Sequence, residues 1–305
     1  MNSTVVSPLT GKGNVDFIKR YHVKDIVEAW RDQLQIDISS EFSGVDIDSF
    51  GLYRCNDTDL LFFDPKFEGS EYIYKSLHDG FEWYYVEDKW EYDIAISEIE
   101  KDKYCLEIGC GSGAFIKKAI QKGINIVGLE TNSDAVFKAQ KAGLPIYLGS
   151  VEDAIVKLNN RPDYVLAFQV LEHIAEPYEF IKMMIDSLAP KGRLVICVPN
   201  ADSFYKYDNN VLDMPPHHQT RWSYSVFKKL ESIFPVKLIS AKYEPLNHWH
   251  TESWFNANKN YFRVNKWYGK LLFNRITIPV IHKFLQSKWR QKIKGHTIYV
   301  TFEKI

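Results

Sequence analysis

The sequence lacks paired cysteines, lacks any long apolar run and carries almost no net charge. Its four cysteines, Cys55, Cys105, Cys110 and Cys197, form no C-x-x-C pair. They should therefore be free thiols, because neither a disulfide framework nor a zinc ribbon has this spacing. No apolar run reaches about 18 residues, so no membrane-spanning helix is expected. The first twelve residues are polar and lack the apolar segment of a signal peptide, so we expect a cytoplasmic protein.

The net charge of −1 hides an uneven distribution along the chain. Residues 1–100 carry 9 Lys/Arg against 21 Asp/Glu, a net of −12. Residues 101–250 carry 18 against 16, a net of +2, and residues 251–305 carry 11 against 2, a net of +9. A basic region on a near-neutral protein is typical of a site for anionic ligands or for a membrane surface.

The most informative stretch is residues 104–115, where an apolar run ends in three glycines at alternate positions. Gly109, Gly111 and Gly113 predict a buried strand, a tight turn and the first turn of a helix. Glycine suits such a turn because it accepts positive φ and lets a ligand approach the backbone. The free N–H groups at the start of the helix can then face that ligand.

Strands and helices alternate after this turn, which predicts an α/β fold with a mostly parallel sheet covered by helices on both faces. The predicted strands are 125–130, 145–148, 163–168, 192–198, 236–242 and 297–302, and the predicted helices are 134–142, 152–158, 177–188 and 223–233. About fifty residues separate the last two strands, which is too long for a simple connection and predicts an insertion. Before the turn we expect a helix within 16–34, a hairpin within 44–63, and an aromatic helical cap or a lid over a ligand within 72–92.

Two cofactor classes bind at a glycine turn of this kind. Gly109, Gly111 and Ala114 satisfy a dinucleotide-binding pattern, and Glu130, 19 residues after Gly111, could accept the hydroxyls of a ribose. Both features suit NAD and S-adenosylmethionine equally. Glu107 discriminates between them, because a carboxylate there would repel a pyrophosphate and attract an ammonium group.

With these residues in view, the chain resembles the class I S-adenosylmethionine-dependent methyltransferases over residues 100–246 and again at 296–303. Four segments in order carry the resemblance: Leu106–Gly113, Val127–Glu130, Asp163–Ile174 and Leu188–Asn200. Within the family the chain looks like the bacterial branch related to ubiquinone-type O-methyltransferases and to sugar or surface-polysaccharide methyltransferases, a likeness to which Pro215–Trp222 adds.

The resemblance implies a Rossmann-like, seven-stranded, mostly parallel sheet with helices on both faces. It also implies a division of the chain into an acidic, aromatic N-terminal extension or lid (1–100), a cofactor-binding core (101–246), a basic amphipathic helical insertion (247–295) and a final core strand (296–305). Some relatives carry a cysteine zinc ribbon near the N-terminus. Only Cys55 of such a ribbon is present here, so no metal is predicted there.

Cofactor roles follow from the resemblance, residue by residue. Glu107 would hold the methionine amino group, and Glu130 would bind the ribose hydroxyls. The three glycines of the turn would let the cofactor lie against the backbone. The other implied contacts are Thr131 beside Glu130, Val151 and Glu152 at the adenine edge, and Phe168 and Gln169 near the sulfonium.

Histidines are the candidate catalytic residues. The methyl group would move by in-line displacement, which needs orientation and, for a hydroxyl acceptor, a base. His217 and His218 are the candidate bases, whereas His173 resembles a family histidine that bonds the loop shaping the site. Certain relatives bind a divalent metal through Glu-x-x-Glu-His and a later histidine. Here Gln169 replaces the first glutamate, so no catalytic metal is predicted.

The insertion is basic and apolar at once. Residues 259–294 hold ten Lys/Arg and no Asp/Glu, and helical spacing on both sides of Pro279 predicts two amphipathic helices. A cap over the acceptor pocket, a helix pair on anionic lipid, and recognition of a phosphate-bearing acceptor all stay open. No nucleic-acid partner is expected, because no RNA-binding module is recognisable. Arg221 and Trp222 could grip an acidic or sugar acceptor, or cap the helix that follows.

The sequence therefore predicts an S-adenosylmethionine-dependent methyltransferase that acts on a small-molecule or sugar-like acceptor, at oxygen. We expect it in the cytoplasm, with contact to the inner face of the membrane through 259–294 as one open interpretation. Two alternatives are an NAD-dependent oxidoreductase and a cofactor-binding scaffold without turnover.

Overall fold

A seven-stranded sheet forms the centre of the computed structural model, which describes residues 4–81, 87–153, 160–208 and 210–305. The strand order is β10-β11-β8-β7-β4-β5-β6. The strands are β4 (Tyr104–Ile108), β5 (Asn125–Glu130), β6 (Ile146–Leu148), β7 (Tyr164–Phe168), β8 (Arg193–Pro199), β10 (Val236–Pro245) and β11 (Lys294–Lys304). The strands from β4 to β8 run parallel, and β11 runs antiparallel to both of its neighbours. The predicted Rossmann-like sheet is confirmed.

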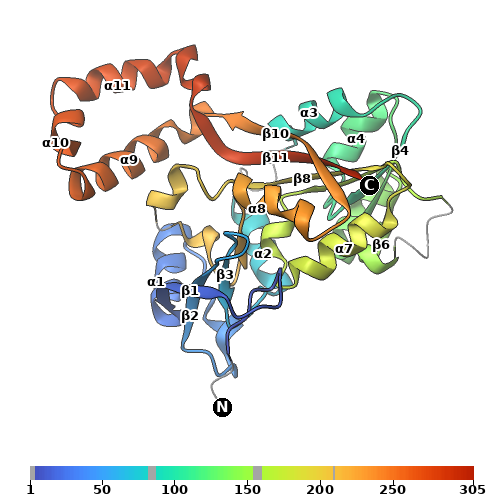
Figure 1. Cartoon of the computed structure of the whole chain (residues 1–305), viewed down its shortest axis with the longest axis horizontal. Coiled ribbons are helices and arrows are strands. Elements are labelled where there is room, and N and C mark those ends of the chain that lie inside the picture. Colours follow the sequence, from blue (N-terminus) through green and yellow to red (C-terminus); the bar gives the residue numbers. More distant parts are fainter. Residues whose placement is uncertain (1–3, 82–86, 154–159, 209) are drawn as a thin grey trace.

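Helices pack on both faces of this sheet (Figure 1). One face carries α3 (Trp90–Glu98), α4 (Ala114–Gln121) and α5 (Ser133–Lys141), and the other carries α7 (Pro177–Ser187) and α8 (Tyr224–Lys229). The central strand β7 shows why. Val165 and Ala167 enter the core on one face, and Tyr164, Leu166 and Phe168 enter the core on the other. A strand buried on both faces is apolar throughout, as this one is.

The N-terminal region forms a second, antiparallel sheet in the order β1-β2-β3-β9. Its strands are β1 (Val15–His22), β2 (Ser49–Cys55), β3 (Leu61–Asp64) and β9 (Thr220–Arg221). The predicted hairpin is confirmed as β2 and β3. The last strand, β9, comes from the segment after β8. The N-terminal region is therefore joined to the same stretch that carries two of the candidate histidines.

The predicted helix within 16–34 is wrong in its first part. Residues 16–22 belong to β1, and α1 (Val23–Leu34) begins only after it. Pairing with β2 supplies the backbone hydrogen bonds of β1, so tertiary context decides against a helix there. Within 72–92 the chain forms α2 (Glu71–Gly80) and the start of α3, but Trp83, Tyr84 and Tyr85 lie outside the described residues, as does most of the helix predicted at 152–158.

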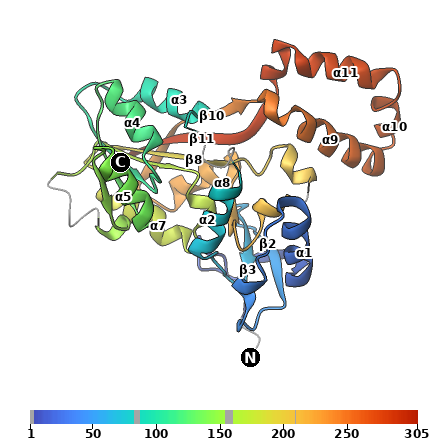
Figure 2. The ribbon, with the colours of Figure 1, turned by 180° about the vertical axis from the view of Figure 1, so that it is seen from behind.

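The insertion stands out from the sheet as an arm in both views (Figures 1 and 2). It consists of α9 (Thr251–Asn265), α10 (Gly269–Leu272) and α11 (Thr277–Gln286). The two predicted helices are present as α9 and α11, but the boundary at Pro279 is wrong, because Pro279 lies in the first turn of α11. Proline is tolerated there, since the first N–H groups of a helix have no intrahelical partner. In the described part of the chain no helix is long and apolar enough to cross a bilayer.

Short 3-10 turns complete the described elements, at Ser39–Phe42, Leu171–His173, Phe204–Tyr207, Val211–Asp213, Leu230–Ser232, His248–His250 and Lys288–Lys292. All four cysteines are buried and free, as predicted.

Candidate active site

The glycine turn lies between β4 and α4, at the carboxyl edge of the parallel strands. Gly109, Gly111 and Gly113 have φ values of 67°, 52° and 84°. A Cβ at Gly109 would lie 2.6 Å from a methyl carbon of Val170, and one at Gly113 would lie 2.6 Å from a methyl carbon of Ile146. The turn therefore requires glycine at these two positions for packing as well as for backbone conformation.

Glu130 ends the neighbouring strand β5 and closes against this turn. One carboxylate oxygen accepts the N–H of Gly111 at 2.8 Å, and the other accepts the N–H groups of Thr131 (2.8 Å) and Asn132 (2.9 Å). A carboxylate has about four acceptor positions, so Glu130 can still accept a ligand hydroxyl. The hydroxyl of Thr131 makes only a long contact to it, 3.4 Å, which a ligand could displace.

Glu107 lies on β4 directly before the turn and is only 3% exposed. Its Oε2 atom is buried and has no hydrogen-bond partner among the described residues. Burial raises the pKa of this carboxyl well above its usual value, and the nearby charge of Glu130 raises it further. An unpartnered buried carboxyl is costly, and a cationic ligand group would relieve that cost. The residues of this turn therefore fit a ligand that presents an ammonium group to Glu107.

Two further buried carboxyls lie in the same region. Glu91 on α3 accepts a bond from Nε2 of Gln169 at 3.3 Å, and Glu172, after β7, has one oxygen without a partner among the described residues. Burial raises the pKa of both groups, and the charge of Lys89 lowers the pKa of Glu91, Glu107 and Glu172 alike. Three buried acids with one shared cation form a site suited to a positively charged ligand.

The pKa of Glu172 makes a prediction about stability. Burial raises the pKa of Glu172 from 4.5 to about 8. Between pH 4.5 and pH 8 the carboxyl group is therefore protonated in the folded chain and ionised in the unfolded chain. The free energy of unfolding should therefore fall as pH rises from about 5 to about 8, by up to roughly 4–5 kcal/mol from this group. Glu172→Gln should remove that fall.

Chemical denaturation of both proteins at pH 5 and pH 8 checks this expectation. The two proteins should be similar at pH 5, where Glu172 is neutral, and the variant should be more stable at pH 8. Equal loss of stability in both proteins between these pH values would contradict it.

Phe168 ends β7 and Gln169 follows it, and the two residues have different roles in the fold. Gln169 has a left-handed backbone, φ 56°, and its N–H donates to the carbonyl of Cys197 at 2.7 Å. A left-handed non-glycine residue costs about 1–2 kcal/mol, and such strain concentrates at functional sites. Phe168 instead packs in an aromatic cluster with Phe115 and Tyr92, at ring-centroid distances of 4.9 and 5.4 Å. Gln169 is thus the more accessible of the two to a ligand.

Val151 and Glu152 follow β6 at the same edge of the sheet. Val151 is buried in the core, whereas Glu152 is exposed. Residues 154–159, which come next, lie outside the described residues. Contact of this pair with an adenine ring stays a prediction.

The three candidate histidines form one cluster. The ring centroids of His173, His217 and His218 lie 4.5 to 4.8 Å apart. Nδ1 of His173 lies 2.7 Å from the carbonyl of His217, and Nδ1 of His217 lies 2.8 Å from the carbonyl of Leu212. A carbonyl only accepts, so both Nδ1 atoms carry the proton and both Nε2 atoms keep a lone pair. Burial lowers the pKa of all three, that of His173 to about 4, so they are neutral at pH 7.

Asp213 and Arg221 support the third histidine. Nδ1 of His218 lies 3.4 Å from one oxygen of Asp213, and Nε of Arg221 lies 2.9 Å from the other. Arg221 also donates to the backbone carbonyl of Asp213, so its guanidinium is occupied within the chain. Trp222 is fully buried against Phe227 and offers no surface to an acceptor.

The N-terminal region supplies part of the wall around this cluster. Tyr74 on α2 lies 5.6 Å from the ring of His173 and 6.0 Å from that of His217, and Trp30 on α1 lies 6.3 Å from His217. The sequence indicated a lid in this region but not which side chains reach the histidines. Tyr74 belongs to the aromatic segment interpreted as a cap or a lid, although its contact with the histidines was not predicted, and Glu91 and Asp213 were missed as site residues. Only Glu91 had a local signal, as an acid between two aromatic residues of a helix.

Two groups of three side chains in the described part of the chain could hold a metal ion. They are His173 with His217 and His218, and Glu244 with His250 and His296. Within each group the potential ligand atoms lie within 4.8 Å of one another. The absence of a catalytic metal stays a prediction.

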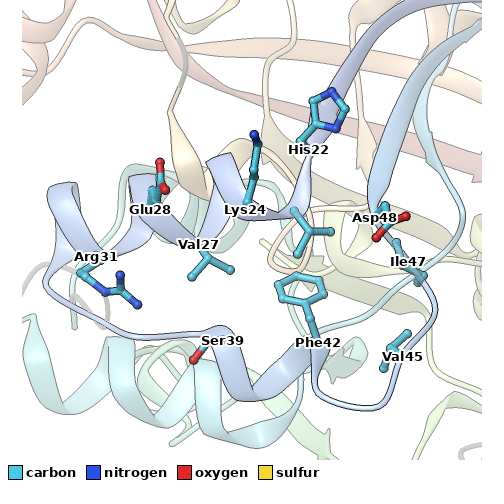
Figure 3. Close-up of a pocket in the computed structure, with 11 residues that line it drawn as sticks. His22, Lys24, Val27, Glu28, Arg31, Ser39, Phe42, Val45, Ile47 and Asp48 are labelled. Carbon is cyan, nitrogen blue, oxygen red and sulfur yellow. The ribbon is translucent and has the colours of Figure 1, made fainter.

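A hollow of about 590 Å³ lies away from these residues, between α1 and the loop that follows it (Figure 3). His22, Lys24 and Arg31 face it together with Glu28 and Asp48. These charges have mixed signs and include none of the candidate site residues. The hollow lies in the N-terminal region, so we assign the active site to the carboxyl edge of the large sheet instead.

Comparison with known proteins gives three findings. A family model described as a methyltransferase domain matches residues 83–258, which is 176 of the 305 residues. The ubiquinone biosynthesis O-methyltransferase of Methylobacterium nodulans is 30% identical over 92 residues, 28% of this chain and 37% of that protein. The enzyme of the same name from Dinoroseobacter shibae is 32% identical over 97 residues, 30% of this chain and 39% of that protein. The match thus spans less than two fifths of these relatives.

Among solved structures, a SAM-dependent methyltransferase from Archaeoglobus fulgidus aligns with 77% of this chain and 100% of its own, at 18% identity and a TM-score of 0.49.

Proposed function

The chain belongs to the methyltransferase-domain family, and on that basis we propose that it transfers a methyl group from S-adenosylmethionine to a hydroxyl of a small-molecule or sugar-like acceptor. The observation that carries the proposal is the buried, unpartnered carboxyl of Glu107 beside the glycine turn. The methionine part of S-adenosylmethionine brings an ammonium group to that position, whereas NAD would bring a pyrophosphate. Ubiquinone biosynthesis O-methyltransferases among the relatives favour oxygen as the accepting atom.

Cofactor binding is assigned to the carboxyl edge of the sheet. Glu107 pairs with the ammonium group, Glu130 accepts the ribose hydroxyls, and Gly111 lets the ligand lie against the backbone. Val151 and Glu152 border the adenine. When bound, S-adenosylmethionine supplies a methyl group attached to a positively charged sulfur. A nucleophile can accept this methyl group, with the sulfur as the leaving atom. The chain mainly holds the two reactants in line, which can lower a barrier by about 7–11 kcal/mol in favourable cases.

His218 is the proposed general base. Its Nδ1 faces Asp213, an arrangement that fixes the proton on Nδ1 and leaves Nε2 to accept the proton of the acceptor hydroxyl. The deprotonated oxygen would be the nucleophile toward the methyl group that bound S-adenosylmethionine would supply, and S-adenosylhomocysteine would be the leaving group. His217 is the second candidate base. His173 positions the loop through its bond to the carbonyl of His217.

The acceptor would be an uncharged, hydroxyl-bearing ring. Three neutral histidines and Tyr74 surround the proposed transfer point, and Arg221 is already paired with Asp213. Such a wall offers hydrogen bonds and ring contacts without a free charge.

Incubation with isotope-labelled S-adenosylmethionine and a panel of phenols, catechols and uncharged sugars tests the proposal. We expect label on an acceptor oxygen, with the rate unchanged by EDTA. Reduction of NAD by any of these compounds, without label transfer, would contradict it. A rate abolished by EDTA and restored by Mg²⁺ would instead place a metal at the histidine cluster.

We also propose that the arm contacts the inner face of an anionic membrane. Large apolar side chains lie exposed on it beside basic residues, with Val264, Trp267 and Ile276 all more than 80% exposed. The other strongly exposed apolar side chains of the arm and its base are Trp249, Leu271, Val280 and Trp289. Apolar side chains with an excess of Lys/Arg match the interface of anionic lipid. In Figure 2 the arm extends to the side opposite α4 and α5.

Vesicle co-sedimentation tests this contact. Trp267→Ser with Leu271→Ser should weaken binding to phosphatidylglycerol-containing vesicles by about tenfold or more, because each fully buried apolar side chain contributes about 1.5–3 kcal/mol. Phe137→Ser is the matched control, since Phe137 is an exposed apolar residue on α5 of the core. Equal binding of all three proteins, or no binding of the unmodified protein, would contradict the proposal.

A further inference from the structure

The base of the arm gathers three side chains that no part of the proposed methyl transfer uses. Glu244 lies near the end of β10, His250 at the end of the short turn before α9, and His296 on β11. Nδ1 of His296 lies 3.3 Å from Oε2 of Glu244, and the rings of His250 and His296 lie 4.5 Å apart. Their potential ligand atoms all lie within 4.8 Å of one another.

Two of these atoms are buried and incompletely hydrogen-bonded. Glu244 is 8% exposed, and its carboxylate has His296 and Thr297 as its polar neighbours, with Nδ1 of His296 at 3.3 Å from the buried Oε2 atom. Nδ1 of His250 is buried and has no hydrogen-bond partner among the described residues. Buried polar atoms are normally satisfied, so Nδ1 of His250 and the remaining acceptor positions of Glu244 are open to a further partner close by.

The backbone is built to bring these side chains together. A Cβ at Gly295 would lie 2.7 Å from the carbonyl oxygen of Glu244, so glycine is needed for β11 to approach β10 at this point. One residue later, His296 is thereby placed beside Glu244. The N–H of Leu246 donates to the carbonyl of Ile293 at 2.9 Å, so the two ends of the arm lie side by side at the cluster.

We propose that Glu244, His250 and His296 bind a divalent transition-metal ion. Their donor set favours Zn²⁺, and the bound ion would fasten both ends of the arm to the large sheet. Two imidazoles and one carboxylate are a common zinc set, whereas Mg²⁺ and Ca²⁺ prefer oxygen alone. Zinc bonds of about 2.0–2.2 Å place tetrahedral ligand atoms about 3.4 Å apart. The three atoms lie within 4.8 Å of one another, so small side-chain rotations would bring them to that spacing, and a water molecule would take the fourth position.

The second histidine group, at the proposed active site, provides the contrast. There Nδ1 of His173 and Nδ1 of His217 already donate to carbonyls, and Nδ1 of His218 faces Asp213. The arm cluster has a carboxylate and an unpartnered imidazole nitrogen instead. Binding of an ion at the arm should therefore require His250 and should not change when His217 is replaced.

The test is calorimetric titration of the full chain with ZnCl₂ after removal of metal with EDTA. The unmodified protein should bind one ion at the arm, and His250→Ala and His296→Ala should each weaken that binding by more than about 100-fold, since loss of even an outer-shell partner costs about 10–100-fold. Glu244→Gln keeps the side-chain shape and should do the same. His248→Ala, two residues from His250 and outside both groups, is the matched control.

Limited proteolysis supplies the second readout, independent of enzymatic activity. Zn²⁺ should slow cleavage within 246–295 in the unmodified protein, in His248→Ala and in His217→Ala, but not in His250→Ala. Binding that survives in His250→Ala and Glu244→Gln would overturn the proposal. So would binding lost in His217→Ala alone, which would place the ion in the active site.

Discussion

Replacing His218 with alanine should lower kcat by about 10²–10⁴-fold, the usual contribution of a positioned general base. The affinity for S-adenosylmethionine should stay the same, because Glu107, Glu130 and the glycine turn, to which we assign the cofactor, lie on other elements. Initial-rate measurements with the acceptor found by the labelling screen, together with calorimetric titration of the cofactor, separate the two effects.

The pH profile adds a second readout for this histidine. Burial lowers the pKa of His218, so it stays neutral and able to accept a proton below pH 6.5. The rate should therefore stay high as pH falls through 6.5 and decline only at lower pH. Asp213→Asn should slow the reaction less than His218→Ala does and shift this acidic limb, since Asp213 positions His218 without touching the acceptor.

His217→Ala is the comparison that assigns the base. If the larger loss of kcat follows His217→Ala, the base is His217. If neither variant loses more than tenfold, the hydroxyl loses its proton to another group and the proposed base is wrong.

Replacing Glu130 with alanine should weaken binding of S-adenosylmethionine and S-adenosylhomocysteine by about 100-fold or more. Two hydrogen bonds from ribose hydroxyls to a carboxylate are expected to be lost, each worth about 1.5–3 kcal/mol. The N–H of Gly111 also loses its acceptor, so the turn itself becomes less ordered. Isothermal titration calorimetry measures the change directly.

Asp134→Ala controls for the loss of a nearby carboxylate, because Asp134 is exposed in the first turn of α5 and contacts no proposed ligand position. Glu130→Gln keeps the shape of the side chain and should fall between the two. Unchanged binding in Glu130→Ala would remove the ribose assignment and require the ligand to lie elsewhere along the edge.

The large sheet was predictable because its signals are local. The glycine turn, the apolar runs and the alternation of strands with helices each depend on neighbouring residues, and β4, β5, β7 and β8 all formed where expected. Pairing between distant segments was not predictable in this way. β1 forms because it pairs with β2, and β9 forms because residues about 160 positions after β3 pair with that strand.

The residues of the candidate site also fall into those with a local sequence signal and those placed only by tertiary packing. Glu107 and Glu130 were identified from their positions beside the turn and at a strand end. Glu91, Tyr74 and Asp213 reach the site from α3, α2 and a 3-10 turn, and their roles depend on packing that no short pattern records. The metal cluster at the arm depends equally on folding, because Glu244 and His296 stand 52 positions apart and meet only through the approach of β10 and β11.

The most direct test of the central claim is calorimetric titration of the unmodified chain with S-adenosylmethionine, S-adenosylhomocysteine and NAD. Glu107 and the glycine turn predict binding of both adenosyl ligands in about the micromolar range, and no binding of NAD. Binding of NAD with neither adenosyl ligand, or binding of none of the three, would contradict the assignment of the glycine turn and the proposed function with it.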